Sequence, residues 1–315
     1  ANPGPPPLVE PESAQSETSG VSTTPSDDNP RRSDRTQVQV GVDPVRGGFN
    51  PHLIADDSST VRAIADLTLP SAYVGTSPNR DLLVGVSTLP TSPAAQTVRY
   101  VIAPEAQWSD GTPITGSDFA YLWRGMVTTA GTVNPAAYRA IQAIRISGQG
   151  GKVVDVDFER PVANREELFA HLLPSHLFAA DASDFPFALR NMVPASAGRF
   201  LMADVGRARG TVVLNRNDRF WGTEPASVDI LTLTAARDTT QTADQLRSGQ
   251  LAFVDVTPQE TTQEVFRRVP GVEVREASSS RVLGVVISAT SGLDQAMREQ
   301  VRSLIDVPPV SYTHL

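Results

Sequence analysis

Histidine is the residue that most often carries acid–base or metal chemistry near neutral pH, and this chain has 4 of them. They are His52, His171, His176 and His314. His171 and His176 lie five residues apart, whereas two histidines that bind a metal from one helix face lie four apart. Pro174 stands between them and would interrupt a helix. We therefore interpret both as structural side chains and predict no metal site.

Nucleophilic and phosphate chemistry also lack their usual patterns. The chain contains no Gly-x-Ser-x-Gly elbow and no glycine-rich phosphate loop. Lys152 is its single lysine, and no serine stands three residues before it, which excludes a Ser-x-x-Lys nucleophile. The carboxylate pairs Asp56–Asp57 and Glu166–Glu167 are interpreted as solvated surface. The sequence predicts a protein that is not an enzyme and that uses no cofactor.

Aromatic and hydrogen-bonding side chains follow the first predicted strand, at residues 37–42, and could hold a ligand without catalysis. Loops at the ends of strands are where ligands bind in α/β folds. Phe49, Asn50 and His52 supply stacking and hydrogen bonds in such a loop, and Tyr73 adds a ring and a hydroxyl. The alternative is that each of them packs a loop or contacts the core. We take them as candidate ligand-binding residues.

The segments that position these side chains alternate between strand and helix patterns. Residues 97–102 alternate as a half-buried strand does. Thr115 is a predicted helix N-cap with Asp118 as its capping-box partner, and an apolar stripe at helical spacing follows. The other predicted strands are 82–87, 140–147, 153–158, 211–215, 230–234, 251–256, 272–275 and 282–288, and the other predicted helices are 54–67, 164–173, 242–248 and 295–305. This mixture predicts an α/β fold with mixed sheets.

The composition is that of a globular chain without a nucleic-acid partner. Its 315 residues are 40% hydrophobic and 20% charged, enough for one large domain or two. A net charge of −8 without a basic block gives no attraction to nucleic acid or anionic lipid. The absence of cysteine excludes disulfides and thiolate metal sites. No apolar run reaches the roughly 20 residues of a membrane span.

The first 36 residues form a separate compositional block. They hold seven prolines, six serines and four threonines but no aromatic residue. Such a segment cannot bury enough apolar area to offset the entropy of ordering it. We expect residues 1–36 to be a disordered Pro/Ser-rich tether, as in many bacterial lipoproteins, with a lipidated cysteine upstream of Ala1. The alternative is an ordinary frayed terminus.

Four stretches, in this order along the chain, resemble the family 5 extracellular solute-binding proteins, which are the oligopeptide, dipeptide and nickel receptors of ABC transporters. Residues 108–115 read WSDGTPIT and residues 214–222 read LNRNDRFWG. Residues 243–255 read ADQLRSGQLAFVD and residues 296–306 read AMREQVRSLID. The resemblance covers roughly residues 37–306. It implies a periplasmic-binding-protein-like (class II) α/β lobe with mixed sheets and a truncated second lobe.

The resemblance also implies a domain layout and one more site residue. Residues 37–280 would form the first lobe with its extra subdomain, and residues 281–310 would start the second. Residues 311–315 (SYTHL) fit neither lobe and are expected to be a non-native tail. The family's Gly-Thr-Gly-Pro-Tyr stretch reads SAGRF at residues 196–200, so that Arg199 stands near the interlobe region. An arginine there could meet an anionic group of a ligand.

Two functions follow from the resemblance. The first is an extracytoplasmic substrate-binding protein that binds a peptide or another small molecule and works with an ABC permease. The second comes from residues 48–53 (GFNPHL) and 69–73 (LPSAY), which look like an actinobacterial branch of envelope lipoproteins. That branch implies a glycolipid ligand, an envelope membrane protein as partner, and regulation of phosphatidylinositol mannoside and lipoarabinomannan synthesis without transport. Both readings place the protein outside the cytoplasm, at the membrane only through a lipid anchor.

Overall fold

The structure is a computed structural model that describes residues 35–90, 94–259, 261–277 and 292–304. Its contacts divide the chain into two compact units, one that ends at Val272 and one that starts at Glu273. The first unit contains all the described sheets. The second contains helix α6 (Gln295–Ser303).

A five-stranded mixed sheet organises one half of the first unit, in the order β11-β1-β10-β9-β8. The first strand, β1, runs parallel to both of its neighbours, β10 and β11, although they follow it by about two hundred residues. The other two strands complete the sheet in antiparallel pairs. The strands are β1 (Gln37–Val42), β8 (Phe200–Gly206), β9 (Thr211–Arg216), β10 (Ile230–Ala235) and β11 (Phe253–Asp255).

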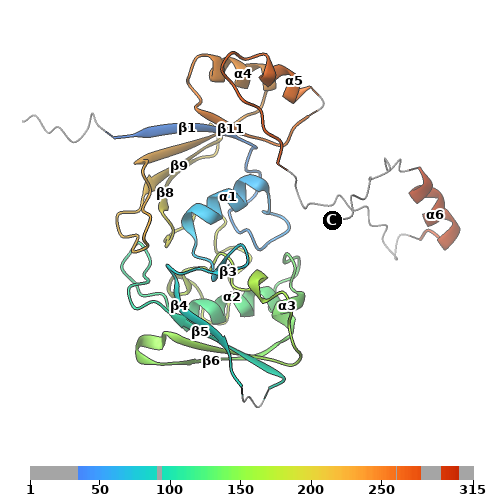
Figure 1. The fold of residues 1–315 in the computed structure, drawn as a ribbon. Coiled ribbons are helices and arrows are strands. Elements are labelled where there is room, and N and C mark those ends of the chain that lie inside the picture. Colours follow the sequence, from blue (N-terminus) through green and yellow to red (C-terminus); the bar gives the residue numbers. More distant parts are fainter. Residues whose placement is uncertain (1–34, 91–93, 260, 278–291, 305–315) are drawn as a thin grey trace, which may run out of the picture. The chain divides into compact units, whose positions relative to one another are not determined.

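Helices cover both faces of the five-stranded sheet. Because side chains alternate along β1, neighbouring residues of this strand face different helices. Val40 and Val42 belong to the same buried core as Ile64 of helix α1. A Cβ atom on Gly41, between them, would lie 3.7 Å from the methyl group of Thr242 in helix α4. Accordingly, α1 (Ser59–Thr68) and α4 (Thr239–Arg247) lie on opposite sides of β1 in Figure 1.

A four-stranded antiparallel sheet, β4-β5-β7-β6, organises the other half of the first unit. Helix α2 (Gly116–Thr128) packs on it (Figure 1). The predicted capping box at the start of α2 is confirmed, since the Thr115 N–H donates to Asp118 Oδ2 over 2.9 Å. The strands are β4 (Leu83–Thr88), β5 (Gln96–Ile102), β6 (Ile141–Ser147) and β7 (Val153–Phe158).

Short elements connect these parts. A hairpin whose strands have two residues each, β2 (Tyr73–Val74) and β3 (Ser77–Pro78), follows α1. The remaining helices are α3 (Ala136–Arg139) and α5 (Thr262–Arg267), and the 3₁₀ turns are η1 (Gln149–Gly151), η2 (Arg165–Glu167) and η3 (Ser175–Leu177). The α/β class with mixed sheets, expected from the sequence, is thereby confirmed.

An aromatic cluster fills the core beneath the four-stranded sheet. Phe169 is fully buried, and its ring centroid lies 4.8 Å from that of Phe119, 5.5 Å from that of Tyr100 and 5.8 Å from that of Tyr138. The rings are tilted or edge-on, the arrangement that aromatic quadrupoles favour. The Tyr138 hydroxyl also accepts a hydrogen bond from the Phe169 N–H over 2.8 Å. This cluster fixes the segment that precedes η3 against the sheet.

Two arginine–aspartate pairs cover the outer face of the same sheet. Arg99 of β5 donates from Nε and Nη2 to the two carboxylate oxygens of Asp155 on β7, each over 2.7 Å. Arg145 of β6 holds Asp157 in the same way over 2.8 and 2.9 Å. The hydrogen bond from Arg99 is the main cause that lowers the pKa of Asp155, and the bond from Arg145 lowers that of Asp157. Both basic side chains on this face therefore have carboxylate partners.

The predicted helix over residues 164–173 is wrong. Only the 3₁₀ turn Arg165–Glu167 forms, and Phe169 and His171 adopt positive φ angles of 57° and 50°. The backbone bonds to tertiary partners in place of its own turns, since the Leu172 N–H donates to Pro70 O and Phe169 O accepts from Ala72 N. Burial of this segment against residues 70–72 overrides its helical pattern.

Other boundaries differ less. Residues 272–275, predicted as a strand, have no regular structure, and the predicted helix 295–305 ends at Ser303. The predicted strand 282–288, the tail 311–315 and nearly all of the expected tether lie outside the described residues.

Candidate ligand-binding site

The loop after β1 brings Asn50 and His52 into the interior. Their exposed fractions are 1% and 7%. The Asn50 side-chain amide donates to Phe185 O over 3.1 Å, and its oxygen accepts from the His52 N–H over 3.1 Å. His52 Nε2 lies 3.0 Å from His171 O. The described contacts of these two side chains therefore anchor the loop to residues 171–185.

Burial determines the charge of His52. It lowers the pKa of this imidazole to about 3, because the desolvated ring cannot be hydrated when charged. The neutral ring donates its Nε2–H to the His171 carbonyl. His52 thus stays uncharged across the physiological pH range and acts here as a structural donor.

Two of the other three histidines are paired with aspartates, and His314 lies outside the described residues. His171 Nε2 lies 2.6 Å from Asp66 Oδ1, and His176 Nε2 lies 2.6 Å from Asp110 Oδ2. Among the described residues, no group of three or more His, Cys, Asp or Glu side chains could hold a metal ion. The same part of the chain contains no helix that is long and apolar enough to cross a membrane.

Tyr73 and Arg199 lie away from the β1 loop. The ring of Tyr73 meets Tyr100 edge-on at 6.4 Å and borders a separate hollow with Arg165. Arg199 precedes β8 and donates to Glu224 Oε2 over 3.1 Å. The sequence-predicted site residues are therefore not gathered in one place by the described part of the chain.

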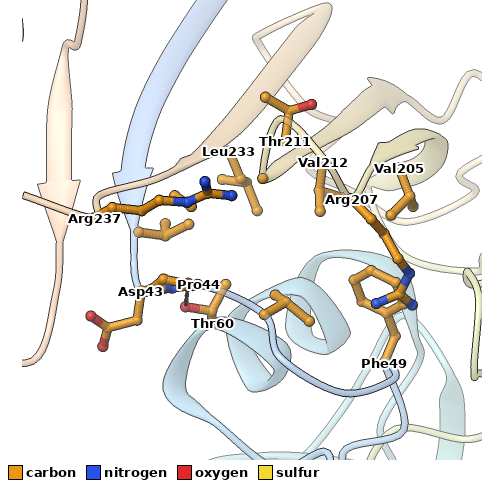
Figure 2. Close-up of a pocket in the computed structure, with 14 residues that line it drawn as sticks. Asp43, Pro44, Phe49, Thr60, Val205, Arg207, Thr211, Val212, Leu233 and Arg237 are labelled. Carbon is orange, nitrogen blue, oxygen red and sulfur yellow. Dashed lines mark hydrogen bonds between the residues drawn. The ribbon is translucent and has the colours of Figure 1, made fainter.

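A small pocket opens where the parallel strands β1 and β10 end (Figure 2). Its volume is about 60 Å³. It is lined by the last residues of both strands, by the loop after β1 and by the β8–β9 turn. Carboxyl ends of parallel strands are the usual ligand position in open α/β sheets. Phe49 is the one sequence-predicted site residue in its lining.

Two arginines give this pocket its positive charge. Arg207, in the β8–β9 turn, donates from Nη1 to Gly47 O over 2.8 Å and from Nη2 to Arg190 O over 2.7 Å. Its guanidinium carbon lies 5.4 Å from the centroid of the Phe49 ring. Arg237, after β10, makes one long hydrogen-bond contact with the described part of the chain, 3.5 Å to Ala208 O. All three acceptors are neutral carbonyls, so neither charge is compensated by a carboxylate among the described residues.

Asp43 is the acidic residue of the lining. Its Oδ2 accepts hydrogen bonds from the backbone N–H and the hydroxyl of Thr257, over 2.9 and 2.7 Å. Its backbone oxygen accepts from Thr60 Oγ1 over 2.9 Å. Figure 2 shows the Asp43 carboxylate turned away from Arg207 and Phe49. Asp43 thus ties the ends of β1 and β11 together at one side of the pocket.

Arg207, Arg237 and Asp43 were missed by sequence reasoning. Asp43 directly follows β1, and Arg237 closely follows β10. Both strands were predicted from the sequence, so the position just after a strand is the signal that could have identified these two residues. Arg207 lies in a four-residue turn whose contact with the β1 loop spans 160 residues of sequence. No local pattern predicts such a contact.

Comparisons with known proteins agree with this architecture. The family model for bacterial extracellular solute-binding proteins, family 5, matches residues 87–306. A probable monoacyl phosphatidylinositol tetramannoside-binding protein, LpqW of Mycobacterium tuberculosis, is 33% identical over 289 residues, which are 88% of this chain and 45% of LpqW. The oligopeptide-binding protein OppA of Mycobacterium bovis is 28% identical over 273 residues, 82% of this chain and 45% of OppA.

Solved structures are similar as well. The periplasmic EDTA-binding protein EppA is 26% identical, with a TM-score of 0.64 over 73% of this chain and 45% of EppA. The oligopeptide-binding protein AppA of Bacillus subtilis, solved with a nonapeptide, has a TM-score of 0.60 at 15% identity over 75% of this chain and 47% of AppA, a likeness of fold alone. The chain spans about half the length of the curated relatives it matches. With the family model matched over most of its described sheets and helices, the chain belongs to the bacterial extracellular solute-binding proteins of family 5.

Proposed function

We propose that this chain is part of an extracytoplasmic substrate-binding protein that captures a peptide or another small solute and delivers it to an ABC permease. The observation that carries the proposal is the pocket at the ends of β1 and β10, because it lies where open α/β sheets hold ligands. The family membership supports the same function. Related proteins named for peptide binding, such as OppA and AppA, share the fold.

The size of the pocket defines its part in binding. Pockets that enclose a drug-sized ligand have about 300 to 1,000 Å³. The pocket at β1 and β10 has about 60 Å³, which suits a single functional group. We infer that it contacts one end of the solute and that the rest of the solute is bound by other surfaces of the whole protein.

The residues predicted from the sequence remain part of this proposal. Phe49 contributes a ring at the pocket, and Asn50 and His52 hold the loop that carries it. Tyr73 and Arg199 would contact a ligand only at separate places on the surface. The layout of a tether over 1–36, a first lobe over 37–280 and the start of a second lobe over 281–310 stays a prediction, as does a lipid anchor upstream of residue 1.

A second candidate is a glycolipid-binding or regulatory protein without a transport role. It is favoured by the similarity to LpqW, whose identity of 33% exceeds the 28% of OppA. The same pocket would then contact part of a mannosylated phosphoinositide headgroup. Genes for a permease and an ATPase beside the gene for this protein would favour transport over this alternative.

Thermal unfolding of the purified protein with candidate ligands tests both functions. A ligand at 100 times its dissociation constant adds about 2.7 kcal/mol to the stability of the folded state. For a chain of this length that corresponds to an increase in Tm of roughly 4 °C. Stabilisation by peptides supports the transport receptor. Stabilisation by a phosphatidylinositol mannoside and by no peptide would contradict it and support the second candidate.

A further inference from the structure

The charge of the pocket at β1 and β10 is more informative than its shape. Arg207 and Arg237 are exposed side chains, and an exposed arginine without a carboxylate partner can offer its guanidinium to an anionic group of a ligand. Arg207 and Arg237 both line the pocket, and neither forms an ion pair within the described residues. Figure 2 shows them entering the pocket from two different segments. Two uncompensated positive charges thus face one small volume.

Arg207 is held in position without being neutralised. Its contacts with Gly47 O and Arg190 O use one N–H of each terminal nitrogen, and a guanidinium has five N–H groups. The Phe49 ring lies beside it, with the guanidinium carbon 5.4 Å from the ring centroid. The remaining donors of a guanidinium form a planar fork that matches the oxygens of a carboxylate or a phosphate. The turn therefore holds the guanidinium at two points and leaves further N–H groups for an oxyanion.

Arg237 supplies the second charge with less restraint. Within the described residues its one hydrogen-bond contact, 3.5 Å to Ala208 O, is at the limit of a hydrogen bond. A Cβ atom on Gly210 would lie 3.0 Å from Arg237 Nη2, so glycine at this turn leaves room for the guanidinium. The acidic lining residue, Asp43, is already bound to Thr257 and does not neutralise either arginine.

From these observations we propose that the pocket binds an oxyanion, a carboxylate or phosphate group of the solute, between Arg207 and Arg237. The proposal rests on the proposed solute-binding function and specifies the ligand group that this site takes. The volume of about 60 Å³ accommodates such a group, and Val42, Val212 and Leu233 form an apolar part of the lining beside it.

Calorimetric titration of the purified protein with inorganic phosphate and with acetate, at constant ionic strength, tests the site directly. Arg237→Gln removes a charge whose described contacts are few, and it should weaken anion binding at least about tenfold, as expected for loss of a charged hydrogen-bond donor. Arg209→Gln is the control, since Arg209 lies in the β8–β9 turn with Arg207 but pairs with Asp204 and does not line the pocket. The control should bind as the wild type does.

A second variant distinguishes a loss of anion binding from a folding defect. Arg207→Gln would break two structural hydrogen bonds, so Arg207→Lys is used, which keeps the charge but loses the fork. It should weaken binding by an intermediate factor while the Tm stays near that of the wild type. Equal binding by the wild type and Arg237→Gln, or no binding at about 10 mM phosphate and acetate, would overturn the proposal.

Paired ligands then distinguish the two sources of the oxyanion. A peptide with a free carboxyl terminus is compared with its C-terminal amide, and glycerophosphoinositol is compared with inositol. Loss of binding on removal of the charged group, in either pair, supports the site and identifies its source. If neutral and charged members bind equally, and Arg237→Gln leaves both unchanged, the oxyanion site is refuted while the solute-binding function stands.

Discussion

The outer face of the four-stranded sheet and the pocket at the end of the five-stranded sheet use arginine in opposite ways. On the four-stranded sheet, Arg99 and Arg145 each hold an aspartate through two short hydrogen bonds. At the pocket, the described hydrogen bonds of Arg207 and Arg237 go to backbone carbonyls, and Arg207 also lies over the Phe49 ring. The same side chain thus completes a surface in one region and leaves donors unused in the other. Residue type alone does not distinguish these roles; the partner does.

The side chains that pack beneath the two sheets also differ. Interlocked rings around Phe169 pack the four-stranded region. The strands of the five-stranded sheet contribute mostly aliphatic side chains, such as Leu214 and Leu233. Aromatic rings thus dominate the packing of the four-stranded half, whereas the five-stranded half combines aliphatic packing with a charged end.

The largest expected loss of stability comes from removing an aromatic ring of the core. Phe169→Ala should cost about 4 kcal/mol of unfolding free energy, and Leu214→Ala about 3 kcal/mol, because each leaves a cavity in a fully packed site. Phe187→Ala, whose ring is 60% exposed, is the control and should change stability little. Urea denaturation measures all three. A cost for Phe169→Ala no greater than that of the control would remove the distinction between the cores.

Acid should affect the two regions over different pH ranges. His52, in the loop after β1, has a folded-state pKa of about 3, so between pH 6.5 and 3 the unfolded chain takes up a proton there that the folded chain does not. Stability is therefore lost as the pH falls below about 6.5, by about 2 kcal/mol at pH 5. Asp155 has a lowered pKa, so its contribution is present above the ordinary aspartate value and is lost only below about pH 4.

His52→Gln separates these ranges. Glutamine keeps a donor for the His171 carbonyl but does not titrate. The loss of stability between pH 7 and pH 5 should be smaller in this variant than in the wild type by about 2 kcal/mol. Urea denaturation at the two pH values checks it. An identical loss in both proteins would show that His52 is not the group responsible.

The smallest expected effect concerns the ion pairs themselves. A double-mutant cycle on Arg99 and Asp155 should give a coupling free energy of about 1 kcal/mol, because the geometry is bidentate and the aspartate is buried. The exposed pair Arg209–Asp204, at 3.4 Å, should give roughly 0.2 kcal/mol or less. Equal coupling free energies in the two cycles would mean that the Arg99–Asp155 pair stabilises the four-stranded sheet no more than an exposed ion pair does.

Local patterns predicted much of the fold. Alternation along residues 37–42 identified β1 with its correct bounds, and Thr115 with Asp118 identified the start of α2. These signals succeed because they depend on neighbours within one turn of helix or one strand. Residues 164–173 failed because their hydrogen-bond partners come from residues 70–72, about a hundred positions earlier.

The candidate site was less predictable for the same reason. Arg207 and Arg237 come together with Phe49 only after the sheet has assembled in the order β11-β1-β10-β9-β8. Nothing in the spacing of the sequence indicates that β1 pairs with β10 and not with a nearer strand. Phe49 was found because it follows β1 directly, whereas the arginines needed the sheet order.

The position of β1 also has a consequence for the time course of folding during synthesis. Its first residue, Gln37, pairs with Ile230, so the strand emerges from the ribosome well before its partner exists. At about 5 to 20 residues per second, the wait is roughly 10 to 40 s. Strands β4 to β7 need no residue beyond Phe158 and can assemble in that interval. The five-stranded sheet is therefore completed only when β10 and β11 have been synthesised, and β1 must be kept from aggregating until then.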